Sequence, residues 1–147
     1  MDGPRLWFAL CGLLAAGSTL AAELDEHSLN AAELAWKASH IHTYQFKVDY
    51  GSFIPPCLPS RKLRFKVEKD TLANRKHHCA EFEEKFGSVP LMFSFLERAL
   101  AKNPKSIDVE FDPKYGYPRR VDIDWSGLTD DGEAFQVTEF HVSRPGS

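Results

Sequence analysis

Apolar and charged residues alternate along residues 106–124, and this alternation is the clearest structural pattern in the chain. One apolar residue stands at every second position on both sides of a short interruption: Ile107, Val109, Phe111, Val121, Ile123 and Trp125. A period of two is typical of a strand with one apolar face and one solvated face. The interruption places Gly116 between Pro113 and Pro118, which fix φ at two points around a permissive residue. We therefore predict a β-hairpin with a compact turn.

Four more segments are predicted as strands from the same alternation. Thr43–Gly51 and Lys62–Lys69 show it most clearly, with aromatic and β-branched residues on one face and polar residues on the other. Leu72–His78 shows it more weakly, and Ala134–Val142 supplies the last strand. Short connections join most of these segments, which favours antiparallel pairing.

Apolar residues at helical spacing predict a first helix near residue 30. Ser28 or Asn30 can cap this helix, because both side chains can accept a hydrogen bond from a backbone N–H of the first turn. Leu29, Ala32 and Trp36 share one face of it. The stripe is narrow, so we expect a short helix that lies against the sheet with Trp36 as its anchor.

A second and stronger helix is predicted after Ser88, which caps it, with Pro90 tolerated in the first turn. Its apolar stripe has helical spacing throughout: Met92, Phe95, Leu96, Ala99 and Leu100. Asn103 and Pro104 end the helix. The preceding segment Glu81–Phe86 is predicted as a linker. Together the segments predict an α+β fold, an antiparallel sheet of about six strands in α-βββ-α-βββ order with helices packed on one face.

A short positive start and an apolar run precede this domain. Arg5 is followed by the run Leu6–Ala16, and the small residues Thr19 and Ala21 come soon after. These features predict a secretory signal peptide that is cleaved after Ala21. A lipid anchor would instead need cleavage at Cys11, which lies inside the apolar run.

We predict four parts in the chain: a signal peptide, 1–21, an N-terminal helix and lead-in, 22–42, a single α+β domain, 43–142, and a disordered tail, 143–147. No other run approaches the roughly 20 apolar residues that a membrane-spanning helix needs. We therefore expect an exported protein, periplasmic or secreted, without a transmembrane segment in its mature form.

Two cysteines remain once Cys11 has left with the signal peptide. Cys57 and Cys79 are expected to form a disulfide, because cysteine pairs in exported domains usually oxidise. In the chain-entropy model such a bridge contributes roughly 3 kcal/mol. The alternative is a pair of thiols that lie too far apart.

Several segments resemble one bacterial family. The resemblance rests on Tyr44-Gln45-Phe46, the loop with prolines and Cys57, Ser88 before an amphipathic helix, the run 109–118 and the run 130–133. Its most specific piece is the Asp-Pro-x-Tyr-Gly-Tyr-Pro turn. These features resemble the domain-of-unknown-function family numbered 6174, over about residues 40–142.

The resemblance implies an exported and often lipid-anchored bacterial protein with the architecture predicted above. It implies no activity, because none is assigned to the family. The chain departs from the pattern in one respect. Family members place two cysteines close together in the loop around Cys57, whereas the second cysteine here is Cys79.

An acidic run near the carboxyl-terminal end fits the spacing of a twelve-residue calcium loop. The oxygen ligands would be Asp122, Asp124, Ser126, Asp130 and Glu133. Gly127 occupies the position of the required glycine. Calcium loops are flanked by helices, whereas both flanks here are predicted strands. The alternative is a solvated hairpin loop that holds no ion.

Other candidate sites have weaker support. His77, His78 and Cys79 could ligate a soft metal, but adjacent side chains of a strand point to opposite faces. Tyr115 and Tyr117 could be exposed anchors for a partner, or they could pack over their own hairpin.

Charge is uneven along the chain, although the net charge of −3 is modest. Residues 43–78 are mainly basic and residues 106–140 mainly acidic. If these halves occupy separate regions of the sheet, the protein has a basic patch and an acidic patch. Strand faces in solvent are usually charged in any case, so we predict no nucleic-acid partner.

No recognised catalytic constellation stands out. There is no Gly-x-Ser-x-Gly sequence and no glycine-rich phosphate loop, and the carboxylates Asp122 and Asp124 are explained as a solvated strand face. We therefore predict an exported bacterial envelope protein that acts as a non-enzymatic binding or interaction module without a cofactor. Its partner would be an unknown envelope protein or ligand. The alternatives are a calcium- or metal-binding module built on residues 122–133 and, with less support, a small hydrolase.

Overall fold

The computed structural model describes residues 22–52, 62–74 and 80–143. Within these ranges the strands are β1 (Ala22–Glu23), β2 (Tyr44–Ser52), β3 (Lys62–Glu68), β4 (Thr71–Leu72), β5 (Ser106–Phe111), β6 (Pro118–Asp124) and β7 (Glu133–Val142). The helices described are α1 (Glu26–Ala38), α2 (Ala80–Phe86) and α3 (Val89–Ala101). The strands form one antiparallel sheet, so the predicted α+β class is confirmed.

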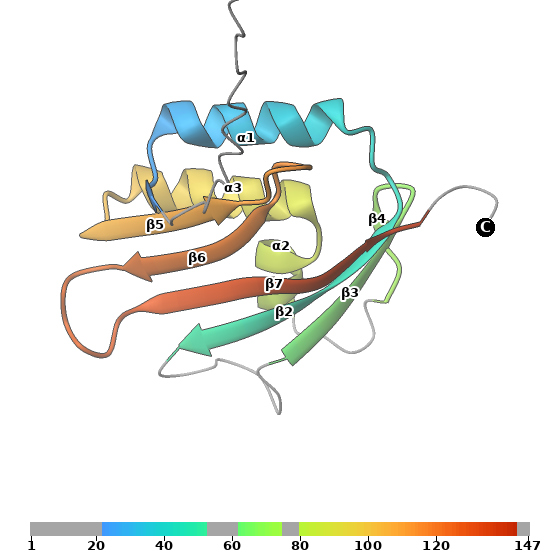
Figure 1. Ribbon diagram of the computed structural model, residues 1–147. Coiled ribbons are helices and arrows are strands. Elements are labelled where there is room, and N and C mark those ends of the chain that lie inside the picture. Colours follow the sequence, from blue (N-terminus) through green and yellow to red (C-terminus); the bar gives the residue numbers. More distant parts are fainter. Residues whose placement is uncertain (1–21, 53–61, 75–79, 144–147) are drawn as a thin grey trace, which may run out of the picture.

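The described strands lie in the order β1-β5-β6-β7-β2-β3-β4. In Figure 1, α2 and α3 lie on the far side of the sheet, and α1 runs alongside α3 at the top. The last strand, β7, lies between the β5–β6 hairpin and the β2–β3 pair and joins the two halves of the sheet. The predicted hairpin is confirmed, with Val109 opposite Val121 in its register.

Two described elements were absent from the sequence prediction. The first is β1, which pairs with β5 at the edge of the sheet and leads to the buried Leu24. The second is α2, where a linker was predicted. Phe82 and Phe86, four residues apart, place both rings in the core, and Lys85 pairs with Glu81 one turn before it.

Other boundaries also differ from the prediction. Helix α1 is capped by Asp25 rather than by Ser28 or Asn30, because the Asp25 carboxylate accepts a hydrogen bond from the Ser28 backbone N–H at 2.7 Å. Ser28 completes a capping box from inside the helix. In the described part of the predicted strand Leu72–His78, only Leu72 lies in a strand, as the last residue of β4.

The core lies between the sheet and the helices and is largely aromatic. Phe86 contacts Phe95 of α3 and Phe135 of β7, with ring centroids 5.8 and 4.7 Å apart. Trp36 of α1 meets Tyr44 of β2 edge to face at 5.2 Å. Aromatic pairs of this geometry add to the burial energy. Trp36 is therefore the anchor of α1, as predicted.

Candidate functional site

The turn between β5 and β6 is closed by its own hydrogen bonds. The Asp112 carboxylate accepts from the backbone N–H groups of Lys114 at 3.0 Å and Tyr115 at 2.7 Å. The Asp112 backbone N–H donates to the Tyr117 carbonyl at 2.8 Å, and its carbonyl accepts from Gly116 at 2.9 Å. Asp112 therefore organises the whole turn.

Gly116 presses this turn against helix α1. Its φ is +80°, and a Cβ there would lie 2.5 Å from the carbonyl oxygen of Ala32. Only glycine combines this backbone conformation with so close an approach. The Asp-Pro-x-Tyr-Gly-Tyr-Pro motif thus has a structural role, which is to hold the hairpin against α1.

The two tyrosines of this turn differ in exposure. Tyr117 is only 7% exposed and stacks on Phe140 of β7. Burial raises its pKa to about 12. Tyr117 therefore lacks the exposure that an anchor for a partner needs, and it packs over its own fold. Tyr115 keeps part of its ring at the surface, below the ammonium group of Lys114.

The proposed calcium ligands are divided between the two faces of the sheet. In the β6–β7 register Asp122 is opposite Ala134, and the buried Ile123 is opposite Glu133. Successive side chains of a strand point to opposite faces, so Asp122 faces solvent whereas Glu133 faces the core. The first and last ligands of the template therefore do not converge.

Glu133 already has partners inside the protein. It is 8% exposed, and its carboxylate accepts hydrogen bonds from the Tyr50 hydroxyl and the Lys85 ammonium, both at 3.1 Å. Lys85 also lies 3.4 Å from Glu81. The buried charge is therefore paired with a cation from α2, as a buried carboxylate requires.

The remaining residues of this loop close local turns. Asp124 accepts from the Gly127 backbone N–H at 2.6 Å, and Ser126 donates to Asp131. Asp130 is exposed. Among the described residues no three His, Cys, Asp or Glu side chains are placed to hold a metal ion.

Several predicted site residues lie outside the described ranges. These are Cys57 and the run His77-His78-Cys79, so their disulfide or ligand roles stay predictions. In the part that the structure describes, no helix is both long and apolar enough to cross a bilayer.

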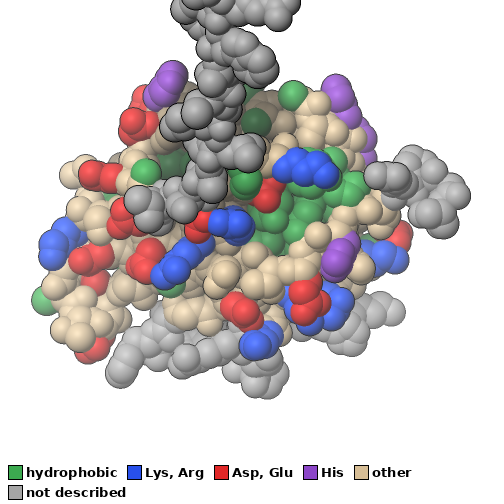
Figure 2. All heavy atoms as spheres, in the orientation of Figure 1, with side chains coloured by type: hydrophobic (Ala, Val, Ile, Leu, Met, Phe, Trp, Pro, Cys, Tyr) green, Lys and Arg blue, Asp and Glu red, His purple; other side chains and the backbone are tan. Residues whose placement is uncertain are grey.

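The basic and acidic halves of the chain do occupy separate parts of the sheet, because β5, β6 and β7 are neighbours on one side of it and β2, β3 and β4 on the other. Acidic and basic side chains are nevertheless interleaved over the face in Figure 2. Glu139 of β7 pairs with Lys47 and Arg64 of the basic half, and Glu68 pairs with Lys66 within that half. These pairs neutralise much of the expected basic patch.

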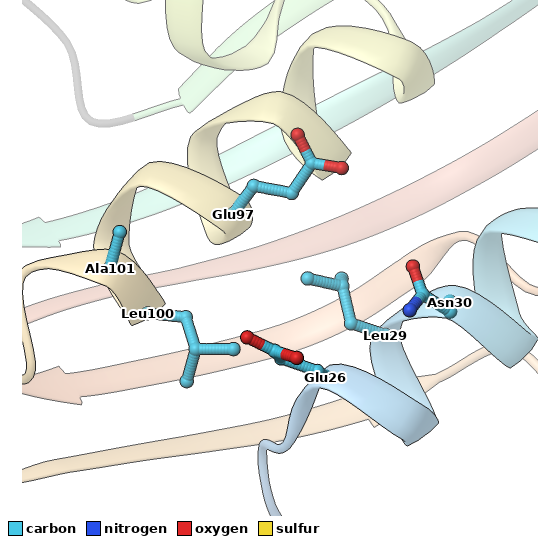
Figure 3. A pocket seen from close by; sticks show the side chains of 6 residues that line it. All are labelled: Glu26, Leu29, Asn30, Glu97, Leu100 and Ala101. Atoms are coloured by element: carbon cyan, nitrogen blue, oxygen red, sulfur yellow. The ribbon is translucent and has the colours of Figure 1, made fainter.

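A groove lies between α1 and α3, and we call it the α1–α3 groove. At one end a cavity of about 270 Å³ is lined by Glu26, Leu29, Asn30, Glu97, Leu100 and Ala101. In Figure 3, Leu29 and Leu100 point toward one another from the two helices. The carboxylates of Glu26 and Glu97 line the same cavity, and no described residue forms an ion pair with either of them.

The other end of the α1–α3 groove has a second cavity, of about 220 Å³. Its apolar lining is Trp36, Ile41, Pro90 and Phe93, and its polar lining is Glu33, Lys37, His40, His42 and Asp70. Here the charges are paired, since Glu33 lies 2.8 Å from Lys37 and Asp70 lies 2.8 Å from His42. The groove thus has apolar side chains in the cavity at each end, and at one end it has two carboxylates without an ion-pair partner among the described residues.

A family model matches residues 28–142 of the chain, and its description is a family of unknown function, DUF6174. The chain belongs to this family. The match runs from the first turn of α1 to the end of β7, so it includes both helices of the α1–α3 groove. No curated protein and no solved structure matches the chain.

Membership in DUF6174 brings no activity, so the candidate site of this family member rests on its own geometry. Sequence reasoning placed Leu29 and Leu100 on the buried faces of two helices. It did not select Glu26 or Glu97, because each is an ordinary exposed residue of its own helix. Their charge becomes notable only when α1 and α3 lie side by side.

Proposed function

We propose that this chain is an exported bacterial envelope protein and a non-enzymatic interaction module, whose α1–α3 groove docks an amphipathic helix of another envelope protein. The observation that carries the proposal is the pair of unpaired carboxylates, Glu26 and Glu97, over the Leu29–Leu100 floor. The occupant would carry Lys or Arg beside apolar side chains, because such a helix complements both the floor and the charge.

The dimensions of the groove suit a helix. Helix α1 has 13 residues, which corresponds to about 20 Å at the usual rise per residue. Apolar residues line cavities at both ends of that length, with Leu29 and Leu100 at one and Trp36 and Phe93 at the other. A helix of three or four turns, the ordinary length in globular proteins, would reach both cavities.

The perturbed titratable groups support a non-enzymatic role, because each has a structural explanation. Burial raises the pKa of Tyr44 and Tyr117, which are both packed into the core. The pKa of Asp25 is lowered by the Ser28 backbone N–H at the start of α1. Lys47 lowers the pKa of the Glu139 carboxylate by a hydrogen bond on the open face of the sheet. None of these four residues lines the α1–α3 groove.

Export is supported by Arg5, the apolar run that follows it and the small residues Thr19 and Ala21. Cleavage after Ala21 would fall directly before Ala22, the first residue of β1. Cleavage there would keep every described element in the mature protein. Oxidation of Cys57 and Cys79 in that compartment stays a prediction.

The docking proposal is tested with a synthetic helical peptide of Leu and Lys, labelled with fluorescein and followed by anisotropy. We expect binding that weakens with salt, and no comparable binding of a peptide in which Glu replaces Lys. The double variant Glu26→Gln/Glu97→Gln should weaken binding by about fivefold, because each exposed charge pair contributes modestly.

Glu84→Gln is the matched control. Glu84 is an exposed carboxylate of α2 outside the groove, so its removal changes the net charge in the same way. The double variant removes two charges and the control removes one. If the loss of peptide affinity per charge removed is the same in both, the peptide responds to net charge alone and the proposal fails.

A further inference from the structure

Another cavity lies beside the carboxyl-terminal turn of α3, on a different face of that helix from the α1–α3 groove. Its volume is about 320 Å³, at the lower end of the range for small-molecule pockets. It is lined by parts of α2, α3, the start of β7 and the residue after β6: Lys85, Phe95, Arg98, Ala99, Lys102, Trp125 and Glu133. We call it the α3–Trp125 pocket.

The charges of this pocket are unequal. Glu133 contributes a carboxylate, but Lys85 and Tyr50 already satisfy it. Arg98 and Lys102 are exposed, and no described carboxylate forms an ion pair with either of them. The pocket therefore has two cations that are available to an anion.

The walls of the pocket are aromatic. Phe95 is buried and Trp125 is half-buried. The Lys102 ammonium lies 5.5 Å from the centroid of Trp125, and the Lys85 ammonium lies 5.4 Å from that of Phe95. A planar apolar body could contact Trp125 while its charged group meets Arg98 and Lys102. Exposed cations beside an apolar wall suit a ligand that is both anionic and aromatic.

We propose that the α3–Trp125 pocket binds small aromatic carboxylates. Arg98 and Lys102 pair with the carboxylate, and Trp125 and Phe95 form the apolar walls. This binding is separate from the helix docking proposed above, because the two sites share no lining residue. Either proposal can therefore fail without the other.

The probe is 2-naphthoate, titrated against the full chain and followed by the NMR signal of the Trp125 indole N–H. A Trp125→Phe variant assigns that signal among the three tryptophans of the chain. We expect saturable movement of the Trp125 signal with 2-naphthoate and much weaker movement with the neutral 2-naphthamide. Raising the salt concentration should weaken the binding of the acid.

Arg98→Gln and Lys102→Gln should each weaken binding by about two- to fivefold, as expected for exposed charge pairs. Lys114→Gln is the matched control, because Lys114 also lies over an aromatic ring, that of Tyr115, but outside the pocket. The proposal is overturned if the amide binds as tightly as the acid, if the Trp125 signal does not move, or if Lys114→Gln weakens binding as much as the pocket variants.

Discussion

Tyr117 and Phe140 stack face to face, with ring centroids 4.2 Å apart and planes inclined by 16°. The pair joins the β5–β6 turn to β7 beyond Gln136, the last residue of β7 with a partner in the β6 register. Phe140 reaches the inner face because β7 has an irregular register around Glu139, whose φ is +49°. The stack thus connects the β5–β6 turn to the part of β7 that no longer pairs with β6.

The ionisation of Tyr117 should make the fold sensitive to alkaline pH. Its pKa is raised from 10.0 to about 12, so between these values the folded state keeps a proton that the unfolded state releases. Stability therefore falls as pH rises through this window, by on the order of 1 kcal/mol per pH unit. Urea denaturation at a series of pH values measures the slope.

Tyr117→Phe keeps the stacked ring and removes the titrating hydroxyl. We expect this variant to lose less stability than the wild type between about pH 10 and 12. Burial also raises the pKa of Tyr44, but that residue is present in both proteins and cancels in the comparison. Parallel losses in the two proteins would show that Tyr117 does not carry the effect.

Gly116→Ala should destabilise the protein by about 2 kcal/mol or more. The added Cβ costs about 1–2 kcal/mol for the left-handed backbone alone, and it would also meet the Ala32 carbonyl at 2.5 Å. Thermal unfolding followed by circular dichroism measures the loss. Gly132→Ala is the control, because its Cβ would find the Ile123 carbonyl at an ordinary 3.6 Å. Equal losses in the two variants would contradict the close approach of the turn to α1.

Removal of Lys85 should leave the Glu133 charge under-compensated. Breaking a fully buried pair costs about 3–5 kcal/mol. The Lys85 side chain is 25% exposed, so we expect about 2 kcal/mol for Lys85→Met. Adding Glu133→Gln should recover most of this loss, because the neutral amide can still accept from Tyr50. Urea denaturation of the single and double variants gives the coupling energy.

The exposed pair Lys66–Glu68 provides a comparison for that cycle. Both side chains are about half exposed, and pairs of this kind contribute about 0–1 kcal/mol. Coupling of Lys85 with Glu133 that is no larger than coupling of Lys66 with Glu68 would show that Glu133 is not held as the structure indicates.

The sequence predicted best where a pattern is local. The period of two in residues 106–124 predicted the hairpin, and Leu29, Ala32 and Trp36 predicted the buried face of α1. Helix α2 was missed because only Phe82 and Phe86 mark it among charged residues. Asp25 was missed as a cap because Ser28, three residues later, is also a good capping residue.

The sites were harder to predict because they depend on tertiary position. The calcium template records spacing along the chain, but it does not record that Asp122 and Glu133 face opposite sides of the sheet. Glu26 and Glu97 belong to separate helices, so no spacing brings them together. Arg98, Lys102 and Trp125 meet only because the end of α3 lies beside the residue that follows β6.

Calcium at millimolar concentration should leave the melting temperature unchanged. A ligand that binds the folded state at a hundred times its dissociation constant stabilises by about 2.7 kcal/mol, which a melting curve resolves easily. The division of Asp122 and Glu133 between two faces leads us to expect no such shift. A shift that disappears in Asp130→Asn would restore the calcium alternative for residues 122–133.

Export predicts a defined amino terminus. If the segment 1–21 is a signal peptide, the protein recovered from the periplasm or medium of a bacterial host should begin at Ala22, as shown by its intact mass. Ala21→Phe should block this cleavage, because the site requires a small residue.

The structure also limits how far beyond Ala22 the mature chain can begin. Leu24 is buried and donates its backbone N–H to Ile107 at 2.8 Å, so a mature chain that began beyond Leu24 would lose both contacts and be less stable. Retention of the full-length chain in the cytoplasm would contradict export.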